Sequence, residues 1–264
     1  MSVLVFILGA SIGSFLNVVV YRLPEGLSLL HPPSRCPRCE HQLKPYDNVP
    51  ILGWLWLRGR CRYCRTAIAF RYPLVEVVTG LLFLGTFLVF DSPVTIVGMW
   101  LFLSWLFALA LIDLDTLTLP SPMTKSGLVL GVVVQSILGW IDGQLSGAIV
   151  YAFGSVIGIV VGIWLFDLIT IFGSAIFGRT AMGGGDAKLA AMMGAWLGWK
   201  YLLLASFLAC VLGAVAGGGA MVFGRLKRRQ QMPFGPYLAL GAAITVFFGE
   251  ALLSSYLSLY FPAQ

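Results

Sequence analysis

Charged residues are scarce in this chain. They make up 11% of its 264 residues, against 59% that are hydrophobic, whereas a soluble domain carries about 25% charged residues. This deficit argues against an ordinary soluble domain. It points to a chain whose solvent is the lipid bilayer.

Long apolar runs support the same conclusion. Eight runs are each close to the roughly 20 residues that a helix needs to cross a bilayer, although the sixth run is short. The first has no basic residue before it and no small-residue cleavage site, so we expect a retained helix and not a removable signal peptide. We predict an all-α integral membrane protein with about eight transmembrane helices. The runs are 3–21, 73–90, 94–112, 122–140, 146–172, 187–199, 201–223 and 235–260.

Basic residues are confined to alternate loops. They accumulate on the cytoplasmic side of membrane proteins, which places the N-terminus outside and predicts cytoplasmic segments at 22–72, 113–125, 173–188 and 224–234. These segments hold every one of the 17 Lys and Arg residues except Lys200. Topology therefore explains the formal net charge of +6, and we expect no nucleic-acid partner. We expect the basic run RLKRRQQ to contact anionic lipid headgroups.

Two Cys-x-x-Cys motifs lie in the loop between the first two runs. Cys36 and Cys39 form one, Cys61 and Cys64 the other, with residues 40–60 between them. Such a pair can wrap four thiolates tetrahedrally around one zinc ion. Two disulfides are the alternative, but the predicted topology puts this loop in the cytosol, where disulfides rarely persist. Because four sulfurs leave no position for a catalytic water, we expect a structural zinc.

Few ionisable residues lie within the apolar runs, and each is a candidate for function because a charge in the membrane is costly. Asp113 lies where the third run reaches the cytoplasmic surface, and Asp186 lies at the same depth beside the sixth. Two carboxylates that share one proton can act as general base on a water and as general acid on a carbonyl. This pair favours aspartic-protease chemistry. Asp115 is nearer to solvent.

Three other acids compete for a catalytic role. Asp167 and Glu250 are embedded more deeply, and Glu76 is near the start of the second run. Each is expected to be either neutral or paired with a basic residue inside the bundle, and Asp167 is the strongest of the three alternatives.

Three consecutive glycines, Gly183 to Gly185, precede Asp186. Glycine permits positive φ and lets another backbone approach without a Cβ in the way, while a carboxylate at a helix start is favoured by the helix dipole. A substrate strand could then lie against Asp186. A glycine-rich turn with a capping aspartate is the alternative, and this short motif alone does not decide between them.

Several blocks of sequence occur in the order found in one family. Through them the chain resembles the bacterial type IV prepilin peptidases, membrane aspartic proteases of the GxGD type that are also N-methyltransferases. The blocks are GSFLNVVVYRLP (13–24), DNVPILGWL (47–55) between the cysteine pairs, RYPLVEVVTG (71–80), IDLDTLTLP (112–120) and GGGDAKL (183–189).

The resemblance implies roles by position. The family's first catalytic aspartate lies seven residues before the proline of a Leu-Pro pair, which corresponds to Asp113 and Pro120. The second ends the Gly-x-Gly-Asp motif, which corresponds to Asp186. The family usually has Asp or Asn after that proline, whereas this chain has Ser121. The supporting residues of the second motif are Gly183, Gly185 and Lys188.

The activity implied by the resemblance has two steps. The leader of a prepilin or a type II secretion pseudopilin is cleaved after a glycine at the cytoplasmic face of the bacterial inner membrane. The new N-terminus is then methylated, with S-adenosylmethionine as donor. No Rossmann-type glycine fingerprint marks a soluble donor site, so the donor-binding residues stay unassigned. The implied domains are a first transmembrane helix (1–23), a methyltransferase-associated zinc domain with four cysteine ligands (24–70) and a polytopic peptidase domain (71–264).

Two other classes of protein remain as alternatives. A proton-coupled transporter would relay protons through Asp113, Asp167, Asp186 and Glu250, but no inverted repeat with paired broken helices is evident. A noncatalytic scaffold would use the zinc loop to dock components of a secretion system. Only a peptidase would shorten a prepilin.

Overall fold

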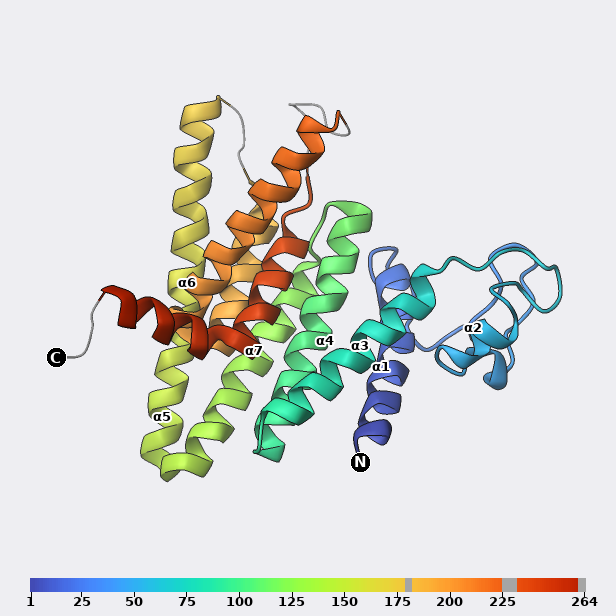
Figure 1. Ribbon diagram of the computed structural model, residues 1–264, viewed down its shortest axis with the longest axis horizontal. Coiled ribbons are helices and arrows are strands. Elements are labelled where there is room, and N and C mark those ends of the chain that lie inside the picture. The colour runs from blue at the N-terminus through green and yellow to red at the C-terminus, as the bar shows by residue number, and fades with distance from the viewer. Residues whose placement is uncertain (179–181, 225–231, 261–264) are drawn as a thin grey trace. The chain divides into compact units, whose positions relative to one another are not determined.

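The computed structural model describes residues 1–178, 182–224 and 232–260, and every regular element in these residues is helical (Figure 1). The chain forms two compact units, Met1–Ser104 and Trp105–Gln264. The elements are α1 (Ser2–Arg22), the 3-10 turn η1 (Pro45–Asn48), α2 (Leu52–Trp56), α3 (Arg71–Val89), α4 (Pro93–Thr116), α5 (Ser121–Phe177), α6 (Gly184–Val222) and α7 (Gly235–Tyr260).

Small residues hold α1 against α3 in the first unit. A Cβ added at Gly9 would meet Phe83 at 2.8 Å, and one added at Gly13 would meet the Glu76 backbone at 2.8 Å. Helices in membranes pack through such small residues because lipid offers no hydrophobic drive for their association. The Gly9 to Gly13 spacing thus fixes the side of α1 that faces α3.

The loop between α1 and α3 is built as two similar hairpin turns. One is closed by a bridge between Arg35 and Gln42, the other by a bridge between Arg60 and Ala67. Between the turns lie η1 and α2, and the Trp54 indole N–H donates to the Ile68 carbonyl over 3.1 Å. The loop therefore has an internal order that hydrogen bonds and a few buried side chains maintain.

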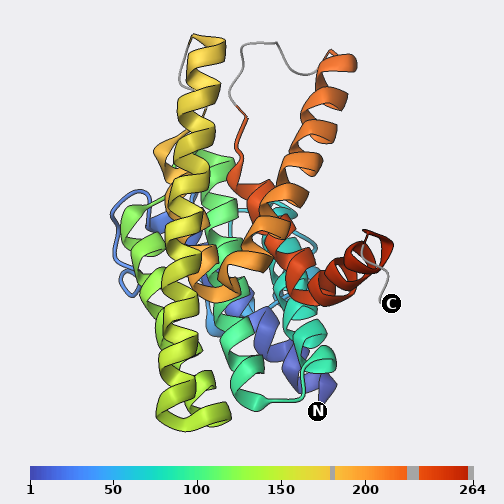
Figure 2. The same cartoon turned by 90° about the vertical axis from the view of Figure 1, so that its left-hand side faces the viewer.

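The second unit is organised around the buried first limb of α6. Helix α5 reverses direction at Gly143 and Gln144, which have non-helical backbone angles, and its two limbs run side by side from this bend (Figure 2). Trp196 of α6 is 2% exposed, and its indole N–H donates to the Gly127 carbonyl of α5 over 2.8 Å. A second break, at Gly198, divides α6.

Within the described residues, six helices are long and apolar enough to cross a membrane. The all-helical membrane fold predicted from the sequence is thus confirmed. The eight predicted runs correspond to these six helices because the fourth and fifth runs are the two limbs of α5, and the sixth and seventh are the two limbs of α6. The predicted domain boundaries at residues 24 and 71 stay a prediction.

Candidate active site and candidate metal centre

Asp113 and Asp186 come together in the second unit from two helices. Asp113 lies in the last turn of α4, and Asp186 lies in the first turn of α6. The two residues are 5% and 8% exposed, and their carboxyl groups are close enough to interact electrostatically. Two buried carboxylates in one place are the arrangement in which one proton is shared. The site can therefore hold one acid and one base.

Gly235, the first residue of α7, closes this site from a third helix. Its backbone N–H donates to Asp113 Oδ2 over 2.9 Å, and the bond is buried. A Cβ at this position would lie 2.7 Å from Asp113 Oδ2, so glycine is what allows the close approach. No role was predicted for Gly235. The signal that could have found it is the pair Gly235-Pro236 at the head of an apolar run, because Gly and Pro punctuate helix starts.

Among the three glycines before Asp186, only Gly185 makes room for a close neighbour. Gly183 has φ −76°, and no residue from Gly183 to Gly185 is among the glycines with positive φ, so the positive φ that glycine permits is not used here. A Cβ added at Gly185 would meet Leu119 at 3.1 Å, whereas one added at Gly184 would meet nothing within 4 Å. The backbone beside Asp186 is thus packed on one side and open on another.

Lys188 joins the start of α6 to the start of α5. Its Nζ donates to Ser121 Oγ over 2.8 Å. Leu119 packs against Gly185 in the same region. These two contacts hold the segment that follows α4 against the first turn of α6, which keeps Asp113 and Asp186 near each other.

The competing acids do not join this pair. Asp115, Asp167 and Glu250 are exposed. Glu76 is 8% exposed, and its Oε2 accepts the Ile51 backbone N–H over 2.7 Å. Glu76 lies in the first unit and holds the cysteine loop to α3 through a backbone amide, so of the two predicted possibilities, a neutral group or a pair with a basic residue, the described contacts show no pair.

The four cysteines of the loop form a compact cluster. The Sγ atoms of Cys36, Cys39, Cys61 and Cys64 all lie within 4.8 Å of one another, and all four cysteines are free. Cys36 and Cys64 are 3.8 Å apart at sulfur, and Cys39 and Cys61 are 3.9 Å apart. A zinc tetrahedron with Zn–S bonds of about 2.3 Å has sulfur–sulfur edges of about 3.8 Å. The cluster therefore fits a metal site with four thiolate ligands.

Backbone and hydroxyl donors in the two turns favour the thiolate form that binds metal. The backbone N–H groups of Cys39 and Arg38 lower the pKa of the Cys36 thiol. The hydroxyl and backbone N–H of Thr66 lower the pKa of Cys64 to about 6. The backbone N–H of His41 acts in the same direction on Cys39, but burial and the neighbouring cysteine sulfurs outweigh it and raise the pKa of Cys39 to about 12. Because a thiolate is the metal ligand, the turns prepare Cys36 and Cys64 for a cation.

Comparison with known proteins covers nearly the whole chain. The family model described as Bacterial Peptidase A24 N-terminal domain matches residues 7–90, and the model described as Type IV leader peptidase family matches residues 100–218. No solved structure matches the chain.

Relatives named prepilin leader peptidase/N-methyltransferase align over most of the length. The protein of Aeromonas salmonicida (strain A449) is 36% identical, with 97% of this chain and 93% of the relative covered. That of Stutzerimonas stutzeri is 36% identical, with coverages of 95% and 92%. That of Myxococcus xanthus (strain DK1622) is 42% identical, with coverages of 82% and 62%.

Proposed function

Since the chain belongs to the type IV leader peptidase family, we propose that it is a prepilin leader peptidase whose catalytic dyad is Asp113 and Asp186. The observation that carries the assignment is the buried pair of carboxyl groups, one of them held by the Gly235 N–H over 2.9 Å. These are the two residues that the family resemblance marks as catalytic, Asp113 seven residues before Pro120 and Asp186 at the end of the Gly-x-Gly-Asp motif.

The chemistry of the dyad is acid–base catalysis of hydrolysis. The ionised aspartate takes a proton from a water, whose oxygen attacks the scissile carbonyl carbon. The protonated aspartate donates its proton to the carbonyl oxygen, and collapse of the tetrahedral intermediate breaks the C–N bond and passes a proton to the leaving amine. The Gly235 N–H orients the Asp113 carboxyl throughout these steps. The open backbone at Gly184 offers a place for an extended substrate strand beside Asp186.

The substrates are prepilins or type II secretion pseudopilins. The leader is removed after a glycine at the cytoplasmic face of the bacterial inner membrane, with the cysteine loop on the same face and the N-terminus of the chain outside. The six membrane-spanning helices and the placement of nearly all basic residues in alternate loops support this topology.

The cysteine cluster is a structural zinc site. Cys36, Cys39, Cys61 and Cys64 would hold the ion, which supplies folding free energy to a loop too small to build a large core. With four sulfurs as ligands, no position is left for a catalytic water. A cluster of four sulfur ligands supports zinc over hard cations such as Mg²⁺ and Ca²⁺, which prefer oxygen ligands.

Methylation of the new N-terminus is the second activity. S-adenosylmethionine would supply the methyl group, and the cysteine-loop domain is where the family resemblance assigns the activity. The supporting observation is the name shared by the relatives, prepilin leader peptidase/N-methyltransferase.

Mass spectrometry of a pilin co-expressed with this protein tests both activities together. We expect loss of the leader and gain of one methyl group on the new N-terminus. A pilin that keeps its full leader would contradict the peptidase and leave the transporter or the scaffold. A shortened pilin without the methyl group would contradict only the second activity.

A further inference from the structure

An outward apolar face lies on the cysteine loop. Leu52, Leu55 and Trp56 of α2 are 64%, 57% and 83% exposed, and their i, i+3, i+4 spacing puts them on one side of the helix. The other side of α2 packs inward, with Gly53 buried and Trp54 bonded to the Ile68 carbonyl. An exposed face of two leucines and a tryptophan is costly in water.

Glu76 fixes where this face lies along α3. Its Oε2 accepts the N–H of Ile51, the residue just before α2. Glu76 follows Arg71, the first residue of α3, by five residues, which is about 7 Å along a helix axis at 1.5 Å per residue. Helix α2 is accordingly tethered beside the first turns of α3. Interfacial helices bury their apolar side roughly 5–10 Å into the boundary between headgroups and acyl chains, and this hydrogen bond holds α2 near one end of a helix that is apolar enough to cross a membrane.

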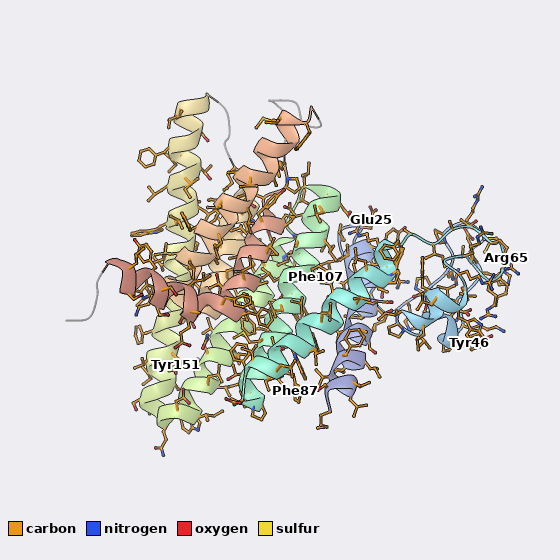
Figure 3. The ribbon with its side chains drawn as sticks, viewed as in Figure 1. Glu25, Tyr46, Arg65, Phe87, Phe107 and Tyr151 are labelled. Atoms are coloured by element: carbon orange, nitrogen blue, oxygen red, sulfur yellow. The ribbon has the colours of Figure 1, made fainter. Side chains whose placement is uncertain are left out.

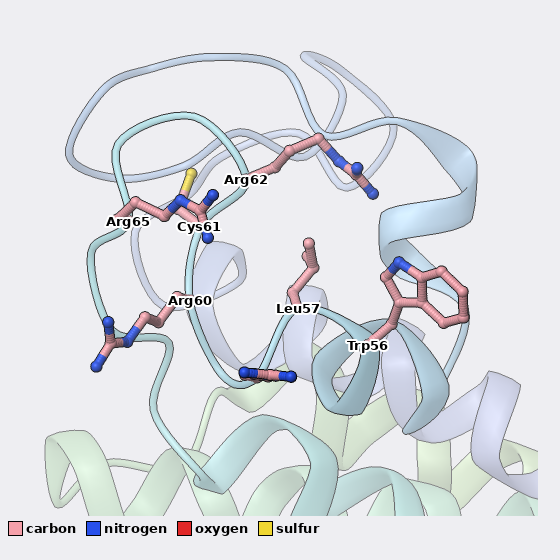
Figure 4. A pocket seen from close by; sticks show the side chains of 7 residues that line it. Trp56, Leu57, Arg60, Cys61, Arg62 and Arg65 are labelled. Atoms are coloured by element: carbon pink, nitrogen blue, oxygen red, sulfur yellow. The ribbon is translucent and has the colours of Figure 1, made fainter.

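A cavity of about 500 Å³ adjoins the apolar face. It is lined by Trp56, Leu57, Arg58, Arg60, Cys61, Arg62 and Arg65. Trp56 stands on one side, Arg60 and Arg65 on the other, with Leu57 between them (Figure 4). Arg65 and Tyr46 both lie at the end of the loop away from α1 (Figure 3).

Most of the positive charge of this cavity is uncompensated. Arg62 is held by Asp47, with its Nε 3.0 Å from Asp47 Oδ1. Arg58, Arg60 and Arg65 are exposed, and within the described parts of the chain no ion pair involves them. A guanidinium binds phosphate through parallel N–H donors. The cavity is thus suited to an anion that arrives beside an apolar surface.

We propose that this loop docks on the bilayer and that its cavity binds the phosphate of an anionic phospholipid. Leu52, Leu55 and Trp56 enter the boundary between headgroups and acyl chains, while Arg58, Arg60 and Arg65 contact the phosphate. Apolar anchor and cationic cavity lie side by side in one loop tied to a membrane-spanning helix, which favours a lipid over a free anion. The inference rests on the membrane fold and is independent of the catalytic dyad.

Hydrogen exchange of the full-length protein in nanodiscs tests this site. We expect amides 50–65 to exchange more slowly in phosphatidylcholine discs containing phosphatidylglycerol than in discs of phosphatidylcholine alone. An arginine near an anionic surface contributes about 1 kcal/mol, a factor of about five in affinity. The triple variant Arg58→Gln, Arg60→Gln, Arg65→Gln should lose this difference. The matched control, Arg35→Gln, Arg38→Gln, Lys44→Gln, removes the same charge outside the cavity and should keep it.

Two further measurements distinguish a lipid phosphate from other anionic or cationic ligands. Inorganic phosphate or S-adenosylmethionine added to the protein in detergent should give no comparable protection. The proposal would be overturned if inorganic phosphate or S-adenosylmethionine protected these amides, or if the amides exchanged equally in the two kinds of disc. It would also be overturned if both triple variants lost the difference equally. Zinc content equal to that of the wild type shows that the variants are folded. Brominated lipid should also quench the part of the tryptophan emission that Trp56→Phe removes, and its failure to do so would contradict insertion of α2.

Discussion

Replacement of Gly235 by alanine perturbs the dyad without removing a carboxyl group. The added Cβ would lie 2.7 Å from Asp113 Oδ2, and ordinary contacts of such an atom begin at 3.4 Å, so the carboxyl or the start of α7 must retreat by about 0.7 Å. The retreat also stretches the hydrogen bond from the Gly235 N–H to Asp113, now 2.9 Å long. Asp113 is therefore displaced from its position beside Asp186.

The expected loss follows from the sensitivity of catalysis to position. A misplacement of about 1 Å costs about 10²-fold in rate, so we expect kcat for leader cleavage to fall about 10- to 100-fold, or about 1.4–2.7 kcal/mol in the barrier. KM should change little because the substrate does not need Gly235 for binding. The assay is cleavage of a purified prepilin in detergent, with kcat and KM measured separately.

The matched control is Gly218→Ala in α6, where an added Cβ meets nothing within 4 Å. Overpacking at Gly235 costs about 1–3 kcal/mol of stability, so thermal unfolding of both variants is measured and rates are compared below the lower melting temperature. A Gly235→Ala protein that cleaves at the wild-type rate would refute the role of the close approach. So would an equal loss in Gly218→Ala.

Three more predictions concern the supporting contacts and the zinc loop. Ser121→Asp places a carboxylate at the Lys188 ammonium, now 2.8 Å from Ser121 Oγ, and should raise the melting temperature slightly; a fall would contradict the contact. Glu40 has φ 55°, a left-handed conformation that costs a non-glycine residue about 1–2 kcal/mol. Glu40→Gly should therefore tighten zinc binding, measured by competition with a chelator, whereas the control Glu25→Gly should not. Cys61→Ser should lose the metal and disorder roughly residues 30–70, with methylation impaired more than cleavage; a metal-free wild type with four titratable thiols would remove the zinc site.

The helices could be predicted from the sequence because hydrophobic length is a local property. Bilayer thickness sets the length of each run. The bend at Gly143 and Gln144 falls in the predicted gap between residues 140 and 146, and the break at Gly198 lies two residues before the predicted gap at residue 200. The pairing of Asp113 with Asp186 could be predicted because both lie at one end of an apolar run on the same predicted side. Each of these inferences needs only residues close together in the chain.

The contacts that complete the site could not be predicted in this way. Gly235 meets Asp113 across 122 residues of sequence, and no local pattern states which helix end will close over a carboxylate. The glycines before Asp186 were expected to permit positive φ and the close approach of another backbone, but none of them has positive φ and Gly185 makes room for the Leu119 side chain. Glu76 was expected to be either neutral or paired with a basic residue, and no pattern in the sequence indicated that it accepts the Ile51 backbone N–H. In each case tertiary packing decides which of a residue's possible uses is realised.

Cleavage by three asparagine variants tests the central claim most directly. An amide cannot exchange a proton between acid and base duty, and general acid–base catalysis contributes about 10²–10⁴-fold. We therefore predict that purified Asp113→Asn and Asp186→Asn insert, fold and bind metal as the wild type does but lose cleavage by about that factor. Asp115→Asn, at an exposed neighbour, should cleave at close to the wild-type rate. Near-normal cleavage by either dyad variant, or a larger loss in Asp115→Asn, would contradict the assignment.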